Sequence, residues 1–297
     1  MCSLSNVSKF LFAVAVVAVC AASSHADTYY LKTGAGSTNW NIPSDWNSMP
    51  DGSGTNATVM TGNDFVVAGK TVGTSSGDTT FGGNSLTLSG GNLNLRNGGT
   101  KTVSTMISSG NSQIYGNTSG TTLSVTNFTN STGATTNLYD NTGTTGSAMV
   151  WNYTFGTLSG SGNFALSSLN DVNPGGSRTF LLTVTTGTAF TGNITWSGTK
   201  VVSLQFGNNL SLGGGLVAND ATSRITLDKD VTFASVTLNG TSLTPGITYS
   251  FATLNAAYDT IFNDGGSGSI TVVPEPATLS MLALGGLGIL IRNRRKA

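Results

Sequence analysis

Cysteine, histidine and glutamate are almost missing from this chain of 297 residues. Cys2, Cys20 and His25 lie within the first 25 residues, and Glu275 lies near the C-terminus, so residues 27–272 contain none of the three. A Ser-His-Asp or Cys-His catalytic device is therefore excluded there, as are zinc sites built from thiolates or imidazoles and a disulfide framework. We predict a protein that is not an enzyme, with no catalytic residue, no metal site and no cofactor.

Charge is scarce as well, at 9% of the residues. Residues 27–272 have 8 basic and 12 acidic residues, and every acid is an aspartate. No basic patch remains to hold a phosphate backbone, so we expect no nucleic-acid partner. Asp228 and Asp230 flank Lys229; on one strand they would share a face and could hold Ca²⁺ or act as the carboxylate pair of a polysaccharide lyase or hydrolase. No third acid is close, so we interpret them as solvated carboxylates.

The N-terminus has the pattern of a secretory signal peptide. Lys9 precedes an apolar run over residues 10–22, and Ser24 and Ala26 supply small side chains at the two positions that a signal peptidase reads. We therefore predict a signal peptide over residues 1–26, with cleavage after Ala26.

Three signals follow one another at the C-terminus. Pro274, Glu275 and Pro276 come first, and the two prolines favour an extended, exposed backbone that a protease cleft can bind. An apolar stretch over residues 277–291 follows; it is shorter than the roughly 20 residues of an ordinary spanning helix, yet we predict a transmembrane helix there. Its membrane-anchoring residues are Ala277, Leu282, Leu284, Leu287, Ile289 and Ile291, and the basic residues kept on the cytoplasmic side are Arg292, Arg294, Arg295 and Lys296.

This order of triplet, apolar span and basic end resembles the PEP-CTERM sorting signal of Gram-negative bacterial surface proteins. The resemblance implies that a membrane-embedded exosortase recognises the Pro-Glu-Pro triplet and cleaves near it. It further implies transit through the inner membrane to the cell surface or extracellular matrix, in association with exopolysaccharide or biofilm. The alternative is an ordinary C-terminal membrane anchor.

The body of the chain, residues 27–272, is rich in Gly, Ser, Thr and Asn. Short segments in which apolar and polar residues alternate recur along it, bounded by Gly-Gly, Asn-Gly, Gly-Asn or Ser-Gly. Such a pattern predicts many short strands joined by tight turns. The segments include residues 65–67, 86–88, 93–95, 123–125, 164–166, 180–184, 194–196, 201–206, 225–227 and 236–238.

The spacing of these segments, 7 to 12 residues with a coarser recurrence near 20 to 25, is typical of the rungs of a β-solenoid. We predict an all-β body folded as a right-handed parallel β-helix; a β-sandwich with Greek-key turns is the alternative. Residues 81–99 resemble the autotransporter-associated β-strand repeat, in which a Gly-Gly pair separates a Leu-rich strand from the next rung. That resemblance also implies a solenoid.

The two flanks of the body have patterns of their own. Trp40 and Trp46 lie near Pro43, and we interpret their rings as a cap on the open end of the solenoid. The alternative is a sugar-stacking platform, which with Trp196 would make the body a carbohydrate-binding module. At the other flank, residues 253–262 are predicted to form a helix over the last rung. Thr253 would be its N-cap and Leu254, Tyr258, Ile261 and Phe262 its apolar face, and residues 264–268 would follow as a flexible stalk.

The sequence thus predicts three parts: a signal peptide (1–26), a β-rich ectodomain (27–272) and a sorting and anchor segment (273–297). The predicted function is that of an exported, non-enzymatic structural protein of the cell surface or extracellular matrix. A carbohydrate-binding surface protein and an aspartate-dependent polysaccharide lyase or hydrolase are the alternatives.

Overall fold

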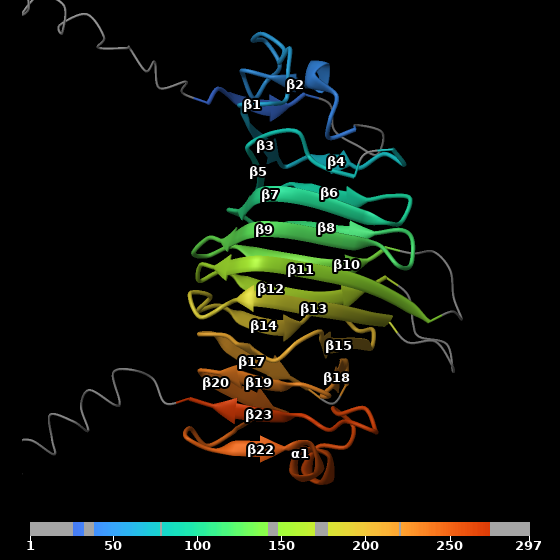
Figure 1. Cartoon of the computed structure of the whole chain (residues 1–297), viewed down its shortest axis with the longest axis vertical. Helices are drawn as coiled ribbons and strands as arrows, with labels where there is room; N and C mark the ends of the chain where they lie inside the picture. The colour runs from blue at the N-terminus through green and yellow to red at the C-terminus, as the bar shows by residue number, and fades with distance from the viewer. Residues whose placement is uncertain are drawn as a thin grey trace, which may run out of the picture.

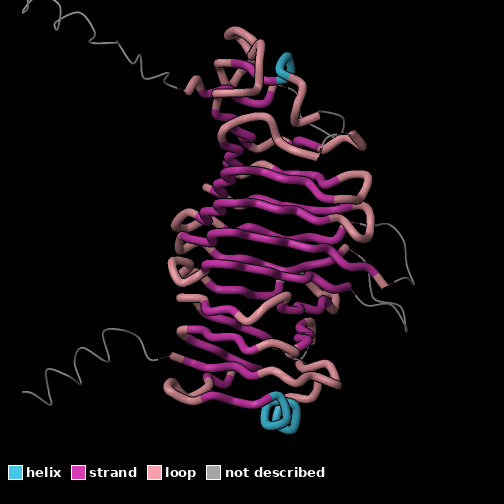
Figure 2. Tube along the Cα trace, in the orientation of Figure 1, coloured by secondary structure: helices cyan, strands magenta, loops and turns pink. Residues whose placement is uncertain are grey.

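Short strands dominate the computed structural model of this protein, which describes residues 26–32, 39–77, 79–141, 148–169, 178–219 and 221–273. They lie across the long axis of the molecule, one above another, as a tall stack (Figure 1). Among the described residues, helical turns occur only near the two ends of this stack (Figure 2). The prediction of an all-β body is confirmed, and all the alternating segments named above lie in or directly beside a strand.

The described strands form three sheets. The ten-stranded sheet A has the order β18-β15-β13-β11-β9-β7-β5-β3-β1-β2, the nine-stranded sheet B the order β21-β20-β17-β14-β12-β10-β8-β6-β4, and the four-stranded sheet C the order β16-β19-β23-β22. Sheet A comprises β1 (Thr28–Leu31), β2 (Trp46–Asn47), β3 (Asp64–Ala68), β5 (Ser85–Ser89), β7 (Thr100–Ser108), β9 (Thr122–Asn130), β11 (Met149–Ser159), β13 (Arg178–Thr186), β15 (Val202–Phe206) and β18 (Ser223–Thr226). Sheet B comprises β4 (Thr71–Gly73), β6 (Asn92–Leu95), β8 (Ser112–Gly116), β10 (Thr135–Asp140), β12 (Asn163–Ser168), β14 (Asn193–Trp196), β17 (Gly215–Ala218), β20 (Ser235–Leu238) and β21 (Thr241–Ser242). Sheet C comprises β16 (Leu210–Ser211), β19 (Asp230–Phe233), β22 (Thr248–Ser250) and β23 (Ser269–Val272).

The chain passes alternately through sheet A and sheet B, and one passage through both sheets is one turn of the stack. Within a sheet, each strand therefore pairs with the strands of the preceding and the following turn. These pairs are parallel; the antiparallel ones, β1–β2, β20–β21 and β22–β23, lie near the ends of the described stack. This pairing differs from the antiparallel pairing of a Greek-key sandwich. The repeat is 21 residues between Asp64 and Ser85, in agreement with the predicted recurrence, but 30 residues between Thr122 and Asn152 in the middle of the stack.

The corner from sheet A to sheet B widens along the chain. Between β5 and β6 it consists of Gly90 and Gly91 alone, and Gly90 has the positive φ, 66°, that favours glycine. From β15 onward an extra strand fits into this corner, and β16, β19 and β23 stack on one another as sheet C. The later part of the stack is therefore built of three sheets, where the earlier part has two.

Apolar side chains from successive strands point inward and form one continuous core. Aromatic rings stack along it: the Phe128 and Phe155 centroids are 4.8 Å apart, and Phe164 lies between Phe155 and Phe190 at 5.9 and 5.5 Å. Each fully buried side chain of this size contributes about 1.5–3 kcal/mol. The core therefore depends on neighbouring turns covering one another, since no single turn can bury its own apolar face.

Strict alternation fails at one level of sheet A. Val103 and Met106 both point inward although two residues separate them, and the same holds for Val125 and Phe128 in the next strand. The pairing brings these interruptions into register, since Met106 lies opposite Phe128. A period of two therefore predicts the existence of these strands but not the face of every residue.

Both ends of the described stack are covered. The 3-10 turn η1 (Pro43–Asp45) and β2 lie at one end, and helix α1 (Phe251–Ala257) lies at the other (Figure 1). The helix is shorter than predicted, and its N-cap is Ser250 instead of Thr253: the Ser250 hydroxyl accepts a hydrogen bond from the Thr253 backbone N–H. This bond satisfies an N–H that has no partner within the helix.

The apolar face predicted for this segment is largely confirmed. Leu254, Ile261 and Phe262 are buried and Tyr258 packs against the core, although Ile261 and Phe262 follow the end of the helix. The predicted flexible stalk at residues 264–268 is wrong. The backbone N–H groups of Ser267 and Gly268 both donate to the carbonyl of Leu227 at 3.0 Å, so this connection is held against the stack.

Candidate functional site

The three tryptophans considered for sugar stacking are all buried. Trp40 and Trp46 are 0% exposed and Trp196 is 9% exposed. The indole N–H of Trp46 donates to the Trp40 carbonyl at 3.2 Å, and that of Trp196 donates to the Val202 carbonyl at 2.9 Å. The alternative of a sugar-stacking platform is therefore wrong, because no ring face is open to a ligand.

Trp40 and Trp46 instead close one end of the core. The Trp46 ring lies 4.9 Å from that of Phe65, and the Trp40 ring lies 5.5 Å from that of Phe81. Short turns around Pro43 bring both rings over the first full turn of the stack. Their role here is to shield apolar side chains that no further turn covers.

Asp228 and Asp230 do not share a face. Strand β18 ends at Thr226 and β19 begins at Asp230, so Asp228 lies in the corner between two sheets. The Asp228 carboxylate accepts a hydrogen bond from the Gln205 amide at 3.3 Å, whereas that of Asp230 accepts one from the Ser269 hydroxyl at 2.8 Å. In the described part of the chain no three His, Cys, Asp or Glu side chains gather as metal ligands do. The carboxylate pair is thus not assembled.

A buried ion pair joins Asp140 and Arg178, which the sequence analysis did not single out. Asp140 ends β10 at an inward position, and Arg178 begins β13. The Ser168 hydroxyl also donates to the Asp140 carboxylate, at 2.8 Å. The alternation in β10, which places Leu138 and Asp140 on the same face, is the signal that could have revealed this buried acid.

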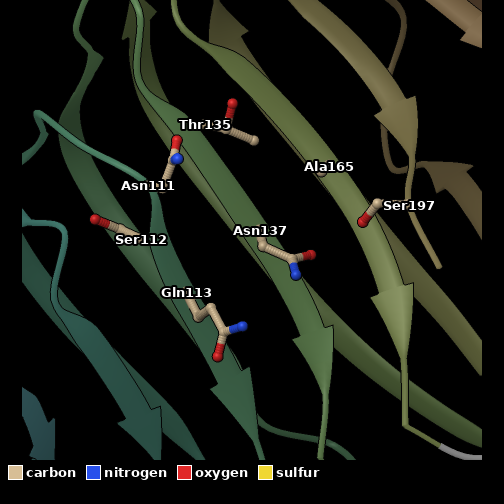
Figure 3. A pocket seen from close by; sticks show the side chains of 7 residues that line it. All are labelled: Asn111, Ser112, Gln113, Thr135, Asn137, Ala165 and Ser197. Carbon is tan, nitrogen blue, oxygen red and sulfur yellow. The ribbon is translucent and has the colours of Figure 1, made fainter.

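A groove of about 320 Å³ lies on the outer face of sheet B, across β8, β10 and β12, and reaches Ser197 just after β14 (Figure 3). Gln113, Asn137 and Ala165 are paired in register on three successive strands, so they form one column. Ala165 carries only a methyl group between the amide of Asn137 and the side chain of Thr195, and the surface is hollowed there. The groove is lined by Asn111, Ser112, Gln113, Thr135, Asn137, Ala165 and Ser197.

The side chains lining the groove are uncharged, and several have free hydrogen-bonding capacity. The amides of Asn111 and Gln113 make no hydrogen bond to any described residue, while the Asn137 oxygen accepts one from the Ser167 hydroxyl at 2.8 Å. An amide offers both an acceptor and two donors. This surface can therefore bind groups that both donate and accept, such as hydroxyls.

Two tyrosines lie in the neighbouring column of the same face. Tyr115 and Tyr139 are paired in register, and their ring centroids are 6.4 Å apart at an interplanar angle of 78°. Burial, and secondarily the charge of Asp140, raises the pKa of Tyr139. Both rings are half-buried. The sequence shows the residues, but only the register shows that they are neighbours.

The C-terminal signals predicted from sequence, from Pro274 to the basic cluster, lie outside the described residues. The signal peptide also lies outside them apart from Ala26, which is two residues before the start of β1. None of the helices in the described part of the chain is long and apolar enough to cross a membrane. The last described residues connect the stack to the tail: β23 ends at Val272, and the Val273 N–H donates to the Phe233 carbonyl at 2.9 Å.

The family model for the PEP-CTERM protein-sorting motif matches residues 272–296. The chain carries a PEP-CTERM sorting motif. The motif indicates an exported, envelope-associated protein that is recognised by an exosortase, in agreement with the sequence analysis. Comparison with curated proteins and with solved structures gives no match. The likeness of residues 81–99 to the autotransporter-associated repeat stays a prediction; these residues form β5, the Gly90-Gly91 corner and β6.

Proposed function

We propose that this protein is a non-enzymatic structural component of the cell surface or extracellular matrix of a Gram-negative bacterium, associated with exopolysaccharide. The observation that carries the proposal is the direct junction between a long β stack and a sorting motif. Strand β23 ends at Val272, and the motif match begins at the same residue. The motif thus delivers the stack itself to the envelope.

The proposed parts are a signal peptide over residues 1–26, the stack over 27–272 and the sorting segment over 273–297. We take the stack to be a right-handed parallel β-helix. Parallel pairing that recurs at each visit to sheets A and B supports this, because parallel strands joined by crossovers are right-handed in almost all proteins. Such a stack is long, and its turns support one another, which suits a structural part.

A passive role is supported by the chemistry that the stack offers. Residues 27–272 hold no Cys, His or Glu. The two aspartates nearest to one another in sequence are engaged with Gln205 and Ser269 on different sheets. Nucleophilic or general acid–base catalysis needs paired groups within hydrogen-bonding reach, and these two carboxylates are not so arranged.

Processing of the tail tests the proposal. Glu275→Ala should leave export intact, because export depends on the apolar run at residues 10–22, but should block cleavage by the exosortase. The uncut protein should stay in the inner membrane, held by residues 277–291 with Arg292 on the cytoplasmic side. Cell fractionation and immunoblotting with a tail-specific antibody measure both steps.

Asp264→Ala is the matched control, because it removes an exposed acid 11 residues upstream of Glu275 without touching the triplet. It should mature like the wild type. Wild-type maturation and surface delivery of the Glu275→Ala protein would show that the segment is only an anchor, and the proposal would fail.

A further inference from the structure

The outer face of sheet B repeats the same chemistry on successive strands. Asn92, Gln113 and Asn137 are paired in register on β6, β8 and β10, so their amides form a column that crosses the strands. Neighbouring strands lie about 4.8 Å apart. Part of this capacity is used within the protein, since the Asn92 amide accepts from the Gln113 backbone N–H at 3.2 Å and donates to the Thr71 hydroxyl at 3.3 Å. The donors and acceptors that stay open recur along the long axis of the stack, and a polymer of repeating units is the matching partner.

The groove lies at the end of this column and forms a hollow in the same face of sheet B. It opens beyond Asn137, where Ala165 replaces an amide, and Thr195 is the next residue in the column. Ser197 and Thr135 add hydroxyls to the lining. A ligand unit lying over Ala165 would thus have polar groups on both sides and a methyl group beneath it.

The lack of charge in the groove limits which ligands it can bind. None of the residues lining the groove is charged. A carboxylate, phosphate or ammonium group held there would lose part of its hydration without gaining an ion pair, which is costly. An uncharged ligand rich in hydroxyls avoids that cost, since each hydroxyl can both donate to and accept from an amide.

The tyrosine pair supplies apolar area beside the amides. Tyr115 pairs with Asn94 on one side and Tyr139 on the other, so the two rings lie in the column next to Gln113 and Asn137. A tyrosine combines an apolar ring with a polar O–H. Sugar rings have the same mixed character, with C–H faces and a rim of hydroxyls.

We propose that the groove on sheet B, together with the Asn92–Gln113–Asn137 column and the Tyr115–Tyr139 pair, binds a linear uncharged polysaccharide lying along the stack. The inference rests on the proposed function, which places the protein in a matrix that contains such polymers. It assigns the contact to sheet B and not to the tryptophans of the alternative considered from the sequence, which are buried.

Affinity electrophoresis of the full chain in mild detergent tests the proposal. Native gels containing dextran, mannan or hydroxyethylcellulose are compared with gels containing alginate, which is anionic. At least one uncharged polymer should retard the protein, and alginate should not. Gln113→Ala should weaken that retardation about tenfold in apparent Kd, the size of one lost hydrogen bond with its packing.

Asn127→Ala is the control. Asn127 is an exposed amide on the outer face of sheet A that makes no side-chain hydrogen bond to any described residue, and its loss should leave retardation unchanged. Retardation by none of the uncharged polymers, equal retardation by alginate, or equal loss in both variants would overturn the proposal. A protein that matures and reaches the surface but binds no uncharged polysaccharide would overturn this inference alone, whereas failed sorting would overturn the proposed function.

Discussion

The Nε atom of Arg178 lies 3.1 Å from the Oδ2 atom of Asp140, and both side chains are buried, at 1% and 0% exposure. Asp140 ends one strand of sheet B and Arg178 begins a strand of sheet A, so the pair joins the two sheets inside the stack. Buried charges are tolerated when they are paired and hydrogen-bonded, and the Ser168 hydroxyl adds a bond of that kind.

Removing one partner of this pair should be more harmful than replacing both. We expect Arg178→Met to lower the free energy of unfolding by about 3–5 kcal/mol, because it leaves the Asp140 carboxylate buried without its counter-charge. The double variant Arg178→Met, Asp140→Leu should recover much of that loss. Urea unfolding followed by circular dichroism measures both, with the exposed Asp264→Asn as the control. Additive losses in the double variant would show that the two side chains do not depend on one another.

Glycine at position 160 should be required by space as well as by backbone conformation. Gly160 has a φ of 94°, and a Cβ there would overlap the carbonyl oxygen of Asn130. Gly133, in the equivalent corner one turn earlier, has a φ of 76° but open space around it. Gly133→Ala should cost about 1–2 kcal/mol, the price of the left-handed conformation, and Gly160→Ala clearly more. Equal losses in thermal unfolding would contradict the crowding argument.

Alkaline pH should destabilise the stack through Tyr153. Burial, followed by the charge of Asp140, raises the pKa of this phenol far above its ordinary value of 10.0. The unfolded chain then loses the proton first, so stability is unaffected below pH 10 and falls as the pH rises above it.

Tyr153→Phe should flatten that fall between about pH 10 and 11. At neutral pH it should cost about 1 kcal/mol, because the hydroxyl donates a 3.4 Å bond to the Ile114 carbonyl. Tyr139→Phe, at a half-buried phenol, should flatten the fall less. The urea concentration at the midpoint of unfolding, measured at a series of pH values, tests this prediction. If stability falls with pH as steeply in Tyr153→Phe as in the wild type, Tyr153 is not the group responsible.

Trp46→Ala should weaken the fold without altering polysaccharide binding. The ring is fully buried against Phe65, so its loss should cost about 3–5 kcal/mol. The groove on sheet B lies several turns away and should keep its retardation in the gels described above. Met49→Ala, at a side chain that is 53% exposed, is the control for stability. Loss of retardation by a folded Trp46→Ala protein would contradict the proposal, because it would place the sugar contact at the end of the stack near Trp46 and not at the groove.

The strands could be predicted because their signal is local. Phe65, Val67, Leu86 and Leu88 alternate with polar residues, and a strand with one buried face requires that alternation. The helix was predicted in the right place with the wrong start, because Ser250 and Thr253 are both good N-caps and only the course of the chain from β22 decides between them.

The groups that make up the groove could not be found in this way. Gln113, Asn137 and Ala165 become neighbours only through the register of strands that are separated by loops of different length. The same holds for Asp140 and Arg178, whose loops carry no pattern that would foretell the pairing.

The sequence by itself determined where this protein is sorted and which chemistry its body lacks. A sorting motif is read as a linear segment, from Pro274 to Lys296, and the absence of Cys, His and Glu from residues 27–272 needs no structure to be known. The tertiary structure alone decided which side chains are exposed together. It buried Trp40 and Trp46, separated Asp228 from Asp230, and brought the amides of sheet B into one column, because contacts between turns depend on register and corner length, which local patterns leave open.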